Sequence, residues 1–172
     1  MEQPGYLQVY IGDGKGKTTA AFGLALRAVC ADLKVYIGQF LKGQAYSELR
    51  ATEFLPKLTI EQFGLPGVIK GQPSEEDLLA GKRGMARAKE ALESNYFDLV
   101  ILDEVTTAVQ VKIVEEEELL QLIDSKPENV ELVLTGREAG LEILDRADLV
   151  TEMKEIKHYF HTGVLARKGI EY

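Results

Sequence analysis

The segment at residues 12–19 constrains the fold of this chain more than any other feature. It reads Gly-Asp-Gly-Lys-Gly-Lys-Thr-Thr, follows a β-branched and aromatic run at residues 6–11, and leads into a helical pattern at residues 18–31. A strand, a glycine-rich loop and a helix in this order are typical of the P-loop, whose backbone N–H groups surround the phosphates of a nucleotide. The sequence therefore predicts a P-loop that binds a nucleoside triphosphate.

The residue types in this loop suggest what each position does. Glycine lets the backbone approach the phosphates closely, Lys17 adds a positive charge, and the hydroxyl of Thr18 is a ligand for Mg²⁺. Only three residues separate the first glycine from the Gly-Lys pair, whereas the usual motif has four, so the phosphates need not occupy the usual register. We predict that the nucleotide contacts Gly12, Asp13, Gly14, Lys15, Gly16, Lys17, Thr18 and Thr19.

The rest of the chain alternates strand and helix patterns. Further strands are predicted at residues 34–40, 58–63, 97–103, 130–135 and 149–153, and further helices at residues 74–94, 115–125 and 138–145. Such alternation is typical of α/β proteins, and a length of 172 residues fits one domain. We predict an α/β, P-loop NTPase-like fold in which a mainly parallel sheet of five to six strands is flanked by helices, as a single domain over residues 1–172.

Charged side chains follow two of these strands. Asp103 and Glu104 come after the apolar run at residues 99–102, where P-loop proteins carry an acidic residue that holds Mg²⁺ directly or through water. The alternative is that they cap the next helix. Arg137 follows the strand at 130–135 and is predicted to bind phosphate through its planar guanidinium group, or else to form a surface ion pair. All three residues are expected at the carboxyl edge of the sheet, where open α/β sheets bind ligands.

Composition excludes several other kinds of site. Acidic residues outnumber basic ones by 28 to 20, which argues against generic binding to nucleic acid or to an anionic membrane. One cysteine and two histidines exclude an intrachain disulfide and a multi-cysteine zinc site. No apolar run reaches about 18 residues, and residues 1–10 lack the profile of a signal peptide. We therefore expect a cytoplasmic protein without a membrane segment.

Two further expectations concern a loop and a helix. The region at residues 41–72 is rich in glycine and proline and is the least regular part of the chain, so we predict that it contains a mobile substrate loop. Cys30 occurs with Phe22 and Val29 on an apolar helical pattern and is predicted to pack in the core.

Taken together, these residues resemble the P-loop type of ATP:corrinoid adenosyltransferase. The resemblance covers nearly the whole chain, and the order of the motifs identifies the family better than any one of them. The matching pieces are the short loop at 12–19, Gln39-Phe40 with Lys42-Gly43, Leu102-Asp103-Glu104, Thr135-Gly136-Arg137, and the end from Lys157-His158 to Gly169-Ile170-Glu171-Tyr172.

The resemblance implies a reaction and its participants. The 5'-deoxyadenosyl group of ATP would be transferred to the cobalt(I) of a reduced corrinoid, with release of triphosphate, and ATP would lie in reversed orientation in the shortened loop. Lys17 and Glu104 would be the catalytic residues, and Thr18 with Glu104 would hold Mg²⁺. Phe63 and the residues after it, with Phe40, would line the corrinoid cavity. A homodimer and an electron donor such as a flavoprotein are implied as well, without nucleic acid or membrane.

The sequence differs from the family pattern in two places, and it also allows two other functions. Asp13 replaces the asparagine common in this loop, so its carboxylate must point outward or help to hold metal. Relatives carry a longer segment before the first strand, and we expect that lid to be absent here or supplied from elsewhere. A P-loop small-molecule kinase or ATP-dependent synthetase would transfer the γ-phosphoryl group instead, and a nucleotide-binding switch would hydrolyse ATP slowly.

Overall fold

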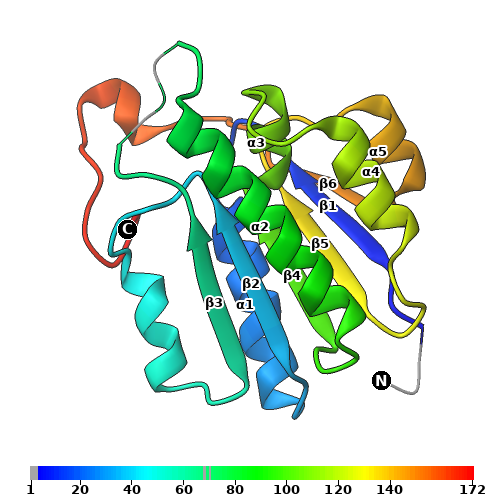
Figure 1. The fold of residues 1–172 in the computed structure, drawn as a ribbon. Coiled ribbons are helices and arrows are strands. Elements are labelled where there is room, and N and C mark those ends of the chain that lie inside the picture. Colours follow the sequence, from blue (N-terminus) through cyan, green and yellow to red (C-terminus); the bar gives the residue numbers. More distant parts are fainter. Residues whose placement is uncertain (1–3, 68, 70) are drawn as a thin grey trace.

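The computed structural model describes residues 4–172 except 68 and 70, and these residues form one parallel sheet with helices on both faces (Figure 1). The strand order is β3-β2-β4-β5-β1-β6, and every strand pair is parallel. The predicted α/β class is therefore confirmed. The six strands are β1 (Leu7–Ile11), β2 (Val35–Phe40), β3 (Leu58–Phe63), β4 (Leu99–Asp103), β5 (Glu131–Thr135) and β6 (Leu149–Glu152).

The helices form two layers. One face of the sheet packs on α1 (Lys17–Cys30), and the other face packs on the remaining α-helices (Figure 1). Those are α2 (Glu75–Glu93), α3 (Val105–Gln110), α4 (Glu116–Asp124) and α5 (Leu141–Arg146); the short 3-10 helices are η1 (Ser47–Glu53) and η2 (Tyr159–Thr162). None of the helices in the described part of the chain has the length and apolar character needed to cross a bilayer.

The core follows from the alternation of side chains along the central strands. In β2, Val35 and Ile37 point to the α1 layer, whereas Tyr36 and Phe40 point to the α2 layer. All residues of β2 and β4 are buried, as expected for parallel strands covered on both faces. The apolar runs in the sequence therefore correspond to the most buried strands.

Helix boundaries agree with the sequence patterns where a capping signal is present. Ser74 caps α2, because its hydroxyl accepts from the N–H of Asp77 while the Asp77 carboxylate accepts from the N–H of Ser74. The helix predicted at 138–145 instead begins at Leu141, after Gly140 in extended conformation. Within the region at 41–72, the structure places η1 and β3; residues 68 and 70 of the predicted mobile loop lie outside the described residues.

The prediction for Cys30 is wrong. The cysteine is exposed at the last position of α1, because the buried face of that helix consists of Ala21, Ala25 and Ala28. The larger apolar side chains of the helix, such as Phe22, Leu24 and Val29, are only partly buried against the core.

Candidate functional site

The P-loop lies at the carboxyl edge of the sheet, between β1 and α1. Gly12 and Gly16 have φ angles of 112° and 125°, which favour glycine. A Cβ atom at Gly12 would also lie 2.3 Å from the carbonyl oxygen of Met153, and the N–H of Gly14 donates to that oxygen at 2.7 Å. Gly12 is therefore required for two reasons: its positive φ angle favours glycine, and a side chain there would collide with the backbone of Met153, just after β6.

Lys17 is buried at the start of α1. Its Nζ atom donates to the carbonyl oxygens of Gly12 and Gly14, at 2.5 and 3.0 Å, so the ammonium group lies inside the curve of the loop. Burial lowers the pKa of Lys17, while the carboxylate of Glu104 opposes this effect. A phosphate that enters the loop would replace these carbonyl oxygens as the partner of the ammonium group.

Asp103, the fully buried last residue of β4, connects the P-loop to the neighbouring strands. Its Oδ1 atom accepts from the hydroxyls of Thr18 at 2.9 Å and Thr135 at 2.7 Å. Its Oδ2 atom accepts from Lys42 at 2.9 Å and from the amide of Gln39 at 3.3 Å. The sequence predicted Asp103 at this edge, but it did not predict Gln39 and Lys42 as its partners. In the sheet, β2 pairs with β4, and this pairing places Gln39 opposite Asp103.

Lys42 is the least expected cation of the site. Its ammonium group forms ion pairs with Asp103 at 2.9 Å and with Glu48 at 3.4 Å, and only 15% of its side chain is exposed. Burial alone would lower the pKa of Lys42, but the carboxylates of Asp103 and Glu48 outweigh burial and raise it. Lys42 is therefore a firmly charged group between the sheet edge and η1.

Glu104 has a left-handed backbone, with φ 61°, and is the N-cap residue directly before α3. Its N–H donates to the Thr135 hydroxyl at 2.9 Å, and its carboxylate accepts from the Thr107 hydroxyl at 2.7 Å. This turn directs the Glu104 side chain away from the buried position of Asp103 and toward open space at the sheet edge, where it lines two cavities.

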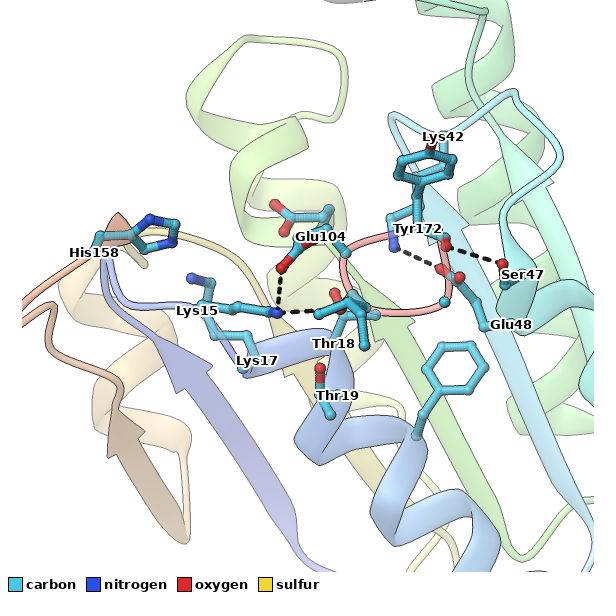
Figure 2. Close-up of a pocket in the computed structure, with 15 residues that line it drawn as sticks. Lys15, Lys17, Thr18, Thr19, Lys42, Ser47, Glu48, Glu104, His158 and Tyr172 are labelled. Carbon is cyan, nitrogen blue, oxygen red and sulfur yellow. Dashed lines mark hydrogen bonds and ion pairs between the residues drawn. The ribbon is translucent and has the colours of Figure 1, made fainter. Parts of the chain in front are cut away.

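The first cavity has a volume of about 600 Å³ and opens onto the P-loop (Figure 2). Residues 15–19 form its floor, and Lys42, Ser47 and Glu48 form one side. Residues 169–172, from the far end of the chain, form another wall. The cavity thus combines backbone N–H groups, lysines and the carboxylates of Glu48, Glu104 and Glu171.

The second cavity, of about 490 Å³, adjoins the first because Lys42 and Glu104 line both. Its wall includes the apolar side chains of Leu41, Phe63, Leu65, Ile69 and Val111, together with the charged residues Asp77 and Arg137. The P-loop cavity and this second cavity therefore meet at one lysine and one carboxylate.

The structure separates the two aromatic residues, Phe40 and Phe63, that were predicted to line the same cavity. Phe63 borders the second cavity. Phe40 does not: it is fully buried behind Phe63, with ring centroids 5.8 Å apart, and α2 covers it at Gly84. The prediction that Phe40 lines the cavity is therefore wrong. Its ring instead packs behind Phe63 and supports that side chain from the core.

Asp13 and Arg137 lie on the outer side of the P-loop. Their side chains are 80% and 67% exposed, and they form an ion pair at 3.6 Å. Asp13 therefore points outward, which is one of the two alternatives open from the sequence. Arg137 forms the surface ion pair in this conformation, and it also borders the second cavity. Lys15 and Thr19 line the first cavity beside Gly16, Lys17 and Thr18.

The oxygen donors at the first cavity suit Mg²⁺. The Thr18 hydroxyl and the Glu104 carboxylate line it, and Mg²⁺ usually takes one or two protein oxygens together with phosphate and water. Among the described residues, no group of three or more histidine, cysteine, aspartate or glutamate side chains could hold a metal ion by itself. The chemistry of these donors therefore fits an ion that arrives with a nucleotide.

A solved structure shares this architecture. The crystal structure of the RadB recombinase superposes with a TM-score of 0.57, covering 91% of this chain and 77% of that chain at 15% identity. At this identity the likeness concerns the fold alone.

Similarity in sequence is more specific. The family model of ATP:corrinoid adenosyltransferase BtuR/CobO/CobP matches residues 3–172. The corrinoid adenosyltransferase of Escherichia coli (strain K12) is 35% identical over 100% of this chain and 88% of its own length. Corrinoid adenosyltransferase CobA of Salmonella typhimurium is 34% identical over the same shares, and the corrinoid adenosyltransferase of Pseudomonas aeruginosa is 32% identical over 99% and 85%. The chain therefore belongs to the ATP:corrinoid adenosyltransferase family.

Proposed function

We propose that the first cavity binds ATP with Mg²⁺, and that the second cavity holds a reduced corrinoid to which the 5'-deoxyadenosyl group is transferred. The observation that carries this proposal is the meeting of the two cavities at Lys42 and Glu104. A cavity lined by a P-loop suits a triphosphate, and a neighbouring cavity with several apolar side chains in its wall suits a large macrocycle. Their contact would bring C5' of the ribose next to cobalt.

The reaction needs no side chain that removes a proton. Cobalt(I) supplies an electron pair to C5', the carbon–oxygen bond to the triphosphate breaks, and that oxygen leaves with the bonding pair as part of inorganic triphosphate. Cobalt is thereby oxidised to cobalt(III) bound to carbon. The protein's contribution is to align the two substrates and to stabilise the negative charge that grows on the triphosphate.

Lys17 is the side chain best placed to stabilise that charge. Its ammonium group is already buried within the loop and would pair with phosphate oxygens instead of the Gly12 and Gly14 carbonyls. Thr18 and Glu104 would hold Mg²⁺, which supplies further positive charge to the triphosphate when it is bound. Asp103 would orient Thr18, because it accepts the hydrogen bond of that hydroxyl.

The apolar side chains in the wall of the second cavity have a separate task. Phe63, Leu65 and Ile69 would exclude water and keep a lower axial ligand away from cobalt. Because cobalt(I) must be generated by reduction, we also expect an electron donor such as a flavoprotein. The family pattern further leads us to expect a homodimeric enzyme in the cytoplasm.

The test is formation of the adenosylated corrinoid by the purified protein. With ATP, Mg²⁺ and chemically reduced cobalamin, the absorbance spectrum should change to that of adenosylcobalamin, and a chelator should stop the change. A spectrum that changes equally fast without the protein would contradict the proposal.

A further inference from the structure

The end of the chain lies across the first cavity. Residues 169–172 form one of its walls, and the ribbon that ends at Tyr172 passes between the P-loop and η1 (Figure 2). On the η1 side, the Ser47 hydroxyl donates to the backbone oxygen of Tyr172 at 2.9 Å. On the P-loop side, the contact is made by Lys15. This segment, residues 159–172, is thus held on two sides of the cavity.

Lys15 directs all its hydrogen-bonding capacity to this segment. Its Nζ atom donates to Glu171 Oε1 at 2.9 Å, to the Tyr159 hydroxyl at 3.1 Å and to the backbone oxygen of Ile170 at 3.1 Å. A lysine ammonium group has three N–H donors, and these three acceptors use them all. In this conformation Lys15 therefore has no N–H left for a phosphate, in contrast to Lys17.

Glu171 is the centre of a local cluster. Besides Lys15, its carboxylate accepts from the backbone N–H of Arg167 at 2.7 Å, from the Arg167 guanidinium at 3.1 Å and from the Tyr159 hydroxyl. The guanidinium of Arg167 also lies 5.0 Å from the centre of the Tyr159 ring. Hydrogen bonds from Arg167, Tyr159 and Lys15 lower the pKa of Glu171, so its carboxylate stays charged even at a pH where an ordinary glutamate is protonated. Only 16% of its side chain is exposed.

We propose that Lys15 acts as the anchor that holds residues 159–172 across the nucleotide cavity through Glu171, and that Glu171 is a positioning residue for ATP. The role toward ATP rests on the proposed function, whereas the anchoring does not. The segment supplies one wall of the cavity, between the P-loop and η1. When the anchor is intact, ATP meets a preformed wall and need not order the segment on binding.

The consequence for affinity follows from the population of the closed segment. If loss of the ion pair leaves the segment closed about one tenth of the time, ATP should bind about tenfold more weakly. Once ATP is bound the wall is again in place, so the rate at saturation should change little. If Lys15 were instead a phosphate ligand, its loss would lower the maximal rate, and Glu171 would have no part in the effect.

The first arm of the test needs no nucleotide. Hydrogen exchange of the amides at Val164, Gly169 and Ile170, which donate within the segment, is compared in wild type, Lys15→Met, Glu171→Gln and the double variant. The amides should exchange faster in both single variants than in wild type. In the double variant they should exchange no faster than in the single variant with the higher exchange rate. Lys168→Met, which removes an exposed lysine of the same segment, is the matched control and should exchange like wild type. Unchanged exchange in Glu171→Gln would overturn the anchor.

The second arm measures ATP. Equilibrium binding and steady-state kinetics of the same variants should show Kd and KM for ATP raised about tenfold, with kcat within about twofold, and no further loss in the double variant. If the losses in the two single variants multiplied in the double variant, or if kcat fell for Lys15→Met alone, Lys15 would be a phosphate ligand and the proposal would be overturned. If wild type failed to bind ATP, the proposed function would fall together with the positioning role, while the exchange arm would still decide the anchor.

Discussion

Replacing Asp103 by asparagine should destabilise the protein strongly. The asparagine oxygen can still accept from the hydroxyls of Thr18 and Thr135, but its NH₂ group then faces the ammonium of Lys42 and the amide of Gln39. Two hydrogen bonds to a charged acceptor are lost, and a lysine that is only 15% exposed loses its nearest counter-ion. Losses of this kind cost about 3–5 kcal/mol together.

The assay is unfolding in urea and by heat. For a domain of this size each kcal/mol lowers the melting temperature by roughly 2–4 °C, so a fall of about 10 °C is expected. Asp124→Asn is the matched control, because Asp124 pairs with Arg146 at 2.8 Å on the surface with 57% of its side chain exposed. That variant should lose less than about 1 kcal/mol.

A third variant separates the two causes. Adding Lys42→Met to Asp103→Asn removes the unpaired ammonium group, so the double variant should be more stable than the sum of the single losses predicts. The reasoning would be refuted if Asp103→Asn were no less stable than Asp124→Asn.

Three further changes test the site. Lys17→Met should lower the maximal rate at saturating ATP at least 100-fold, because a preorganised charge at the leaving group is worth about 3 kcal/mol; a variant that kept half the activity would contradict this. Glu104→Gln should raise the Mg²⁺ concentration needed for half-maximal rate more than Asp103→Asn does, since Asp103 already accepts four hydrogen bonds; a metal titration with the reverse order would give Asp103 the ligand role. Gly12→Ala should lower the melting temperature and weaken ATP binding, because its Cβ would meet the Met153 oxygen at 2.3 Å; a thermal shift equal to wild type would show that the loop relaxes.

Local patterns were sufficient for much of the fold and for the polar part of the site. The P-loop, the apolar run before Asp103 and the capping box at Ser74 each depend on residues close together in the sequence. Their structures therefore follow from periodicity and residue type. The start of α5 was less well predicted, because Glu138 and Ala139 fit a helix but precede Gly140 in extended conformation.

Contacts between distant parts of the chain could not be read in the same way. Lys15 and Glu171 are 156 residues apart, and no spacing relates them. The pairing of β2 with β4 places Gln39 opposite Asp103, but strand order is a property of the whole sheet. Phe40 has the residue type of a cavity wall, and only the position of α2 shows that the ring is covered.

The products of ATP provide the most direct test of the proposed reaction, because attack at C5' and attack at the γ-phosphorus leave different fragments. Phosphorus NMR of protein, ATP, Mg²⁺ and chemically reduced cobalamin should show inorganic triphosphate appearing in step with adenosylcobalamin, with little ADP, and ATP should persist when the corrinoid is omitted. Steady release of ADP that does not depend on the corrinoid would contradict adenosyl transfer and would favour phosphoryl transfer or hydrolysis at the same P-loop.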